Sequence, residues 1–462
     1  MTLIVTTSIL NKKTYLMTFI VWAMIITDVI FGTFLDVLGK SLNSSFGVIL
    51  FIIMSITVFF AGLYALRDFM AVLRKDLQAP SFFNRLYKAT PLFLYALVVI
   101  FTAIIVEMVL FSQYSTYLQL LIVLITGVAI LFFGFRTYKF LSWFKSSTNK
   151  RRNIMILAFA VSSMLFCISM IVATVFDTKE LVYSRPSYID PYYHSSNSMA
   201  SRHLSTIELV IHLYAFLVPQ VFAIAIAETV AVAFFLRYFK DQIGRTTLWT
   251  VIILPPVLFL TGIFGPQLLA NTGGVMVYQL PQFFLFRVIG TAGWIGADFV
   301  IASAYLLVAK TLRRQITSSR NKIINYLIIA ALSTILVSPA TNNWITNSSY
   351  PPFGAIQRGF LVLASFLFSI GIYSVAMSVA QDAELRHLAR KYAKEYALLD
   401  TLGNAQEDAE IIRKVVKLVH KQADAMEKET AAEPSMLDDN EVKQYIDLVI
   451  SEFRGKKDHR TY

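Results

Sequence analysis

Residues 154–176 have the sequence IMILAFAVSSMLFCISMIVATVF, in which no side chain is charged. A helix needs about 20 apolar residues to cross the hydrocarbon core of a bilayer, and this stretch is long enough to do so. Arg151 and Arg152 come shortly before it, and Asp177 follows it directly. The stretch therefore predicts a transmembrane helix, and the same pattern recurs in both directions along the chain.

Similar apolar runs occupy most of residues 1–382, which we predict to form an all-α transmembrane domain. The sixth run contains Pro219 and is too long for a straight span, so we expect it to be kinked or tilted. The ten predicted spans lie at about 15–38, 46–66, 91–111, 117–135, 154–176, 206–236, 248–270, 285–309, 323–340 and 359–380.

The composition is that of a polytopic membrane protein. Of the 462 residues, 56% are hydrophobic and only 15% are charged, and the mean hydropathy is +0.61. Soluble domains contain about 25% charged residues, which excludes an ordinary water-soluble domain for most of the chain. Basic loops beside anionic lipid account for the net charge of +12. No basic run is interleaved with aromatic residues, so we predict the lipid bilayer as a partner and not nucleic acid.

Lysine and arginine are unevenly divided between the two predicted sides of the membrane. The N-terminus and the loops after spans two, four, six and eight hold 21 of them, whereas the opposite loops hold five. Cytoplasmic loops carry the excess of basic residues. This bias predicts a multi-pass protein of the cell (plasma) membrane with both ends in the cytoplasm.

The last part of the chain, residues 383–462, is amphipathic instead of uniformly apolar. We expect one helix over 383–402, a break at Gly403, a second helix over 405–430 and a third after Pro434. These elements are too small for a kinase catalytic domain. They predict a helical cytoplasmic tail that offers a docking surface to a cytoplasmic protein.

The last quarter of the chain also resembles a known family. Its motifs are YPPFG at 350–354, ASFL at 364–367, GIYS at 371–374, AQDAELR at 380–386 and YIDLVI at 445–450. They are similar to motifs of a family of multi-pass membrane proteins of ammonia-oxidising archaea. The resemblance implies a shared architecture, but it implies no activity, substrate or site residue.

Four carboxylates fall within the predicted spans: Asp28, Glu107, Glu228 and Asp298. A charged side chain at the centre of the bilayer costs about 2.5–3.5 kcal/mol on insertion scales, and such residues are candidates for function. We expect no Lys, Arg or His at the same depth. The acids can serve as a proton or cation site, or they can be neutral groups that hold the bundle together through hydrogen bonds.

Small residues recur at helical spacing on the sixth and eighth spans, where they would let neighbouring helices approach closely. This spacing predicts that Glu228 and Asp298 face one crowded interior. The small residues are Ala223, Ala227 and Ala231 on one span and Gly290, Gly293 and Ala297 on the other.

Candidate metal ligands lie on the predicted outer side, in the loop before span six and in its first turns. Glu208 and His212 are four residues apart and so share one face of a helix. His203 precedes them, and imidazole and carboxylate ligands suit zinc or copper. The alternative is that these are solvated polar residues of an outer loop.

The sequence contains no nucleotide-binding loop, nucleophile elbow or zinc-protease motif, so no enzymatic activity is assigned. Two classes of function remain. The first is a sensor or signalling protein that relays a change in the bundle to the cytoplasmic tail, which we favour. The second is a secondary transporter that couples to protons or cations through the intramembrane carboxylates.

Overall fold

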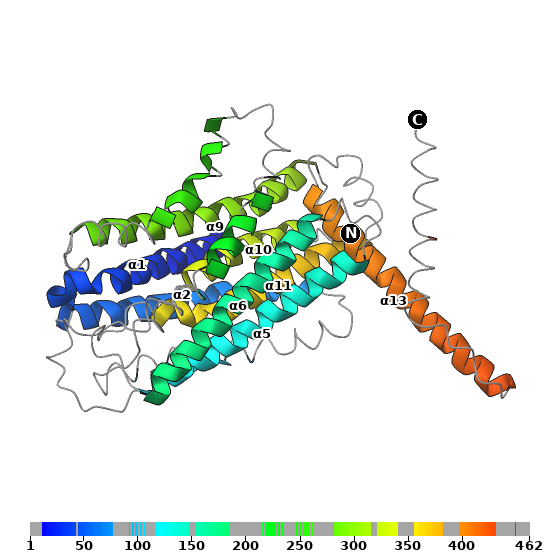
Figure 1. The fold of residues 1–462 in the computed structure, drawn as a ribbon, viewed down its shortest axis with the longest axis horizontal. Helices are drawn as coiled ribbons and strands as arrows, with labels where there is room; N and C mark the ends of the chain where they lie inside the picture. The colour runs from blue at the N-terminus through cyan, green and yellow to red at the C-terminus, as the bar shows by residue number, and fades with distance from the viewer. Residues whose placement is uncertain are drawn as a thin grey trace, which may run out of the picture.

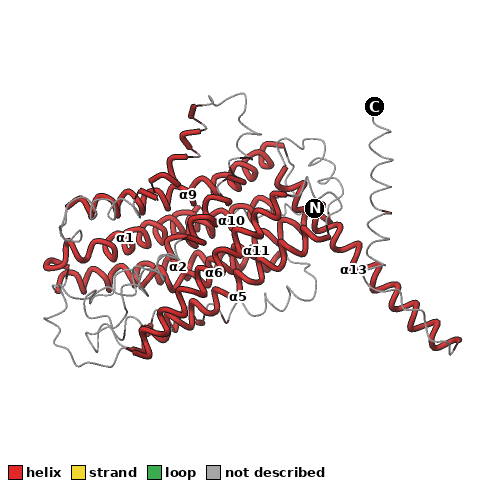
Figure 2. Tube along the Cα trace, viewed as in Figure 1, coloured by secondary structure: helices red, strands yellow, loops and turns green. Residues whose placement is uncertain are grey.

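A computed structural model gives the arrangement of the helices. It describes residues 12–42, 45–76, 116–146, 154–183, 281–315, 321–340, 355–381 and 397–430, together with single positions and short stretches between 92 and 106 and between 215 and 261, and residue 449. All of these residues are helical (Figure 2). The predicted all-α class is therefore confirmed for the described part of the chain.

The helices follow the apolar runs and extend past them. They are α1 (Lys12–Leu42), α2 (Ser45–Asp76), α5 (Thr116–Ser146), α6 (Ile154–Tyr183), α9 (Pro281–Gln315), α10 (Asn321–Ala340), α11 (Ala355–Gln381) and α13 (Ala397–Thr430). At 1.5 Å per residue, the 31 residues of α1 span about 46 Å, more than the roughly 30 Å of hydrocarbon. Such helices continue into the headgroup layer, where polar residues can extend them.

Five of the described helices contain a segment that is long and apolar enough to cross a membrane. The segments are Phe46–Phe69, Val123–Ser146, Ile154–Val175, Ile295–Leu312 and Phe360–Ala380. Shorter apolar helices lie at Val218–Ala231, Trp249–Leu258 and Ile323–Val337. The predicted spans at 91–111, 206–236 and 248–270 fall on stretches that are only partly described, and the described positions there are helical.

Helix α11 lies at the centre of the bundle, with 94% of its apolar segment buried (Figure 1). It packs on α10 and α5, while α9 packs on α10, α6 on α5 and α1 on α2. Close packing on α10 depends on Gly371, since an added Cβ would lie 3.0 Å from the backbone oxygen of Tyr326. Large apolar side chains are exposed on the outer helices, as a lipid-facing surface requires. Leu131 on α5, for example, is 71% exposed.

The small residues on the sixth and eighth predicted spans are buried, as is Asp298, whereas Glu228 lies outside the described residues. A hydroxyl also links helices there, because Ser162 Oγ on α6 donates a hydrogen bond to the carbonyl oxygen of Ala223 at 2.7 Å. The buried small residues are Ala223, Ala227, Ala231, Gly290, Gly293 and Ala297.

The predicted helix break at Gly403 is wrong. Helix α13 continues from Ala397 to Thr430 without interruption. Gly403 lies against α11, where an added Cβ would be 2.3 Å from Cγ1 of Val379. The glycine is therefore explained by close approach of two helices and not by a turn.

Candidate functional site

The structure buries two of the four predicted intramembrane acids. Asp28 on α1 is fully buried, and Asp298 on α9 is 4% exposed. These two helices touch through the rings of Trp22 and Phe299, whose centroids lie 4.9 Å apart. Both carboxyl groups thus belong to the interior of the bundle and not to its lipid-facing surface.

The other predicted site residues lie outside the described part of the chain. Glu107 and Glu228 are two of them, and His203, Glu208 and His212 are the remaining three. Within the described residues, no group of three or more His, Cys, Asp or Glu side chains could hold a metal ion. The outer zinc or copper site stays a prediction.

The predicted end of the fourth span at residue 135 is not the end of the helix. Helix α5 continues to Ser146, and its segment that is long and apolar enough to cross a membrane, Val123–Ser146, contains Arg136 and Lys139. Four side chains on one face of α5 explain why the helix continues beyond residue 135. Phe133, Arg136, Phe140 and Trp143 recur at intervals of three and four residues, which places them along one stripe of a helix.

Arg136 is held by aromatic and hydroxyl groups from three helices. Its Nε donates a 2.7 Å hydrogen bond to Ser163 Oγ on α6. Its guanidinium carbon lies 4.6 Å from the ring centroid of Phe133 and 4.8 Å from that of Phe368 on α11. Tyr305 on α9 also lies near the guanidinium. Among the described residues, no carboxylate forms an ion pair with Arg136, so this cation is stabilised by π faces and a hydroxyl dipole.

A second polar group joins the bundle to α13. Trp143 Nε1 on α5 donates a hydrogen bond to Gln406 Oε1 on α13 at 2.7 Å, and both residues are buried. The Gln406 amide nitrogen in turn donates to Glu410 Oε1 at 2.9 Å and contacts Sδ of Met377 on α11 at 2.9 Å. The amide therefore bridges three helices, and a buried hydrogen bond of this kind is costly to break.

Stacked aromatic rings and buried apolar side chains lie around the Gln406 amide. Trp143 stacks on Tyr373 of α11, with ring centroids 6.1 Å apart and an interplanar angle of 13°. Leu399 and Leu402 on α13 are buried, and Gly403 is pressed against Val379. We refer to Trp143, Tyr373, Val379, Gly403 and Gln406 as the α5–α11–α13 joint.

The joint was not found from the sequence. The available signal was the stripe Phe133–Arg136–Phe140–Trp143, which continues beyond residue 135 and indicates a helix face that still needs a partner. The partner, Gln406, is 263 residues away from Trp143. No local pattern connects two residues so far apart.

Comparison of the chain with known protein families, with curated proteins and with solved structures finds no match.

Proposed function

We propose that this chain is a signalling-type integral membrane protein whose bundle relays a conformational change to the tail through α13. In this proposal residues 1–382 form about ten spans with both ends in the cytoplasm of the cell, and residues 383–462 form a tail that docks a cytoplasmic protein. The observation that carries the proposal is the joint. Its buried Trp143–Gln406 hydrogen bond connects the first turns of α13 to α5, and Gly403 connects them to α11.

The joint is suited to transmitting a movement of the bundle because α13 is buried at its start and exposed farther along. Its first turns are buried among α5 and α11, whereas Arg413, Lys414 and Leu418 are exposed. Figure 1 shows α13 projecting from the end of the bundle at which α5 ends. A small shift of α5 relative to α11 would move the buried turns, and the rigid helix would carry that movement to its exposed end.

The test locks the bundle and observes the tail. In a Cys167→Ser background, cysteines replace Trp22 and Phe299, whose rings are in contact between α1 and α9. The protein in lipid nanodiscs is oxidised or reduced, and amide hydrogen exchange is measured over residues 411–430. If the bundle and α13 are coupled, the rates of amide exchange over residues 411–430 should differ by about 5- to 150-fold between the oxidised and the reduced protein.

Two controls accompany the lock. Trp22→Cys alone should show no redox effect on the exchange of α13. Gly403→Leu in the locked protein should uncouple α13, so that oxidation no longer changes its exchange. If oxidation alters exchange in α1 and α9 but leaves residues 411–430 unchanged in the intact joint, the signalling proposal is wrong.

A second candidate function, a proton- or cation-coupled transporter, is favoured by the burial of Asp28 and Asp298 in the bundle interior. A carboxyl group at that depth prefers its neutral form unless a cation or a counter-charge accompanies it. A transporter would load and release a proton or cation there in each cycle. Asp298→Asn and Asp298→Leu separate this function from a purely structural role.

A further inference from the structure

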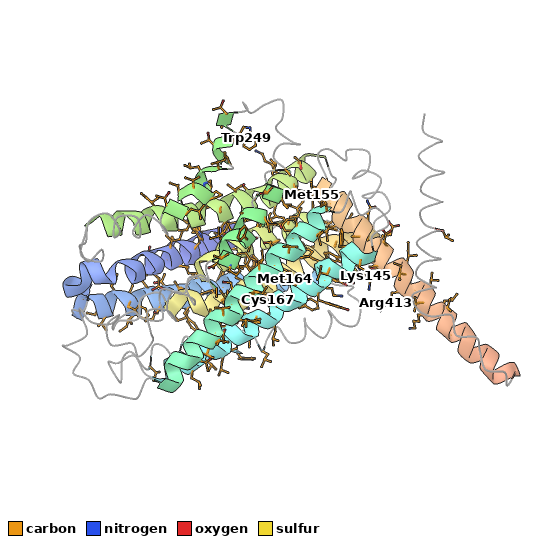
Figure 3. All side chains as sticks on the ribbon, in the orientation of Figure 1. Lys145, Met155, Met164, Cys167, Trp249 and Arg413 are labelled. Atoms are coloured by element: carbon orange, nitrogen blue, oxygen red, sulfur yellow. The ribbon has the colours of Figure 1, made fainter. Side chains whose placement is uncertain are left out.

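Several cations gather where α5 meets α13. Lys145, Arg413, Lys414 and Lys417 are exposed, and Lys139 is half-buried. Arg413 is close enough to Lys139 for the two charges to repel each other. Figure 3 shows Lys145 and Arg413 at the same end of the bundle, beside the first free turns of α13. We refer to these five residues as the basic corner.

Among the described residues, no ion pair joins any of the five cations to a carboxylate. Three carboxylates, Glu407, Asp408 and Glu410, precede Arg413 on α13, and Oε1 of Glu410 accepts the hydrogen bond from Gln406. The five cations outnumber these carboxylates. Lys139 instead approaches the ring of Tyr373, with Nζ 5.8 Å from the ring centroid. A cluster of like charges held by a rigid joint is a binding surface for an anion.

The position of the basic corner indicates which anion it fits. Leu131, Tyr138, Leu141 and Lys145 recur at helical spacing on one face of α5, and all four are exposed. The first three form a lipid-facing stripe, and the apolar segment of α5 ends at Ser146. Lys145 therefore lies at the level of the lipid headgroups, directly above the acyl chains that would contact the stripe.

We propose that the basic corner binds the headgroup phosphate of an anionic phospholipid whose acyl chains lie along Leu131, Tyr138 and Leu141. The bound lipid holds α13 against α5 by screening the repulsion between Lys139 and Arg413. Its presence thus regulates how firmly α13 is joined to the bundle. This inference rests on the proposed function only in taking α13 as the output element.

The test compares nanodiscs of phosphatidylcholine alone with nanodiscs that also contain phosphatidylglycerol. Hydrogen exchange over residues 399–421 reports the attachment of α13, and native mass spectrometry counts the retained phosphatidylglycerol. Phosphatidylglycerol should slow the exchange in the parent protein. The Lys145→Gln, Arg413→Gln double variant should lose that effect and retain lipid about 5-fold more weakly for each cation removed.

Matched variants separate the site from general charge attraction. Lys310 on α9 is another exposed cation within the chain, and Lys310→Gln should behave as the parent does. The charge-preserving variant Lys145→Arg, Arg413→Lys should keep the lipid effect. If this variant also loses the effect, the loss is caused by misfolding and not by the missing charge. Equal exchange in the two kinds of nanodisc would overturn the proposal.

Soluble anions provide the last comparison. If inorganic phosphate added to phosphatidylcholine nanodiscs slows the exchange of α13 as much as phosphatidylglycerol does, the occupant is a soluble anion and the lipid proposal is wrong. Failure here is distinct from failure of the signalling proposal. The disulfide between α1 and α9 can change the exchange of α13 even if lipid charge does not. Lipid charge can likewise change that exchange even if the disulfide does not.

Discussion

Arg136 shows how one residue can be stable at a position that simple hydropathy forbids. Its insertion costs about 2.5–3.5 kcal/mol at the centre of a span. A hydrogen bond from a charged donor contributes about 1.5–3 kcal/mol, and each desolvated cation–π contact contributes up to about 2 kcal/mol. The Ser163 hydroxyl and the rings of Phe133 and Phe368 therefore offset the cost.

This balance predicts that substitutions of Ser163 and of Arg136 change the stability of the protein by different amounts. Ser163→Ala should destabilise the protein by about 1.5–3 kcal/mol, because the buried guanidinium loses its hydrogen-bond acceptor. Arg136→Met should change stability by less than about 1 kcal/mol, because an apolar side chain of similar length removes the charge altogether. Thermal unfolding in detergent micelles measures both, and the double variant should resemble Arg136→Met. Equal destabilisation by the two single changes would contradict this account.

Asp298 separates the transporter from a structural role. Asp298→Asn keeps the size and hydrogen-bonding capacity of the side chain but removes its ionisation, whereas Asp298→Leu removes both. If the acid is a coupling site, the Asn variant should fold normally and abolish proton-coupled or cation-coupled uptake in proteoliposomes. If the acid only holds the bundle, the Asn variant should be silent and the Leu variant should unfold at a lower temperature. The same pair of changes at Asp28 provides an independent test.

Gly403 is predicted to be intolerant of any side chain. An added Cβ would lie 2.3 Å from Val379 Cγ1, so Gly403→Ala should destabilise the joint by about 1–3 kcal/mol through overpacking. Gly134 on α5 is the control, since a Cβ there meets nothing within 4 Å. Gly134→Ala should be neutral or should stabilise the helix by up to about 1 kcal/mol. Equal thermal midpoints for the two variants would argue against close packing at the joint.

At the scale of elements, α13 is one helix with two environments. Its buried first turns owe their position to α5 and α11, and its exposed turns depend on the helix itself. Isolated helices are marginal in water, so the exposed turns should open more readily than the buried ones. The buried hydrogen bond between Trp143 and Gln406 joins the first turns of α13 to α5.

Trp143→Phe tests that link directly. It keeps an aromatic ring for the stack on Tyr373 but removes the indole N–H that Gln406 accepts. The loss of about 1 kcal/mol should speed amide exchange over residues 399–408 about 5-fold. Trp249→Phe is the matched control, because Trp249 is 57% exposed. If Trp143→Phe and Trp249→Phe change the hydrogen exchange equally, the Trp143–Gln406 hydrogen bond does not hold α13 to the bundle.

At the scale of the whole molecule, the described helices form a bundle around α11, whose apolar segment is 94% buried. Hydrophobicity does not drive helices together in lipid, so close packing and polar contacts must do so. Gly371 against α10 and Ser162 against the Ala223 carbonyl provide examples of each. The exposed apolar side chains on the outside then face lipid.

The orientation of this bundle remains a prediction from loop charge, and cysteine labelling tests it. In a Cys167→Ser background, cysteines at Ser195 and Asn347 should react with a membrane-impermeant thiol reagent on intact cells. A cysteine at Ser146 should react only after the cells are opened. Labelling of position 146 from outside would reverse the assigned orientation and place α13 on the outer face.

Most of the described helices could be located from the apolar runs of the sequence. The predicted spans at 15–38, 46–66, 154–176, 285–309 and 359–380 each fall within a described helix. A membrane span must satisfy its backbone hydrogen bonds internally, so a sufficiently long apolar run has only one stable form. That constraint is local, and a single sequence is enough to apply it.

The roles of the polar and small residues became visible only from the packing of the helices. Arg136 resembled the start of a loop because it ends an apolar run, and Gly403 resembled a helix break because glycine is a poor helix former. Partners far away in the sequence reversed both interpretations: Phe368 and Ser163 accommodate the guanidinium, and Val379 leaves no room for a Cβ. The energy of a polar or small residue in a bundle depends on what packs against it, and packing is not encoded locally.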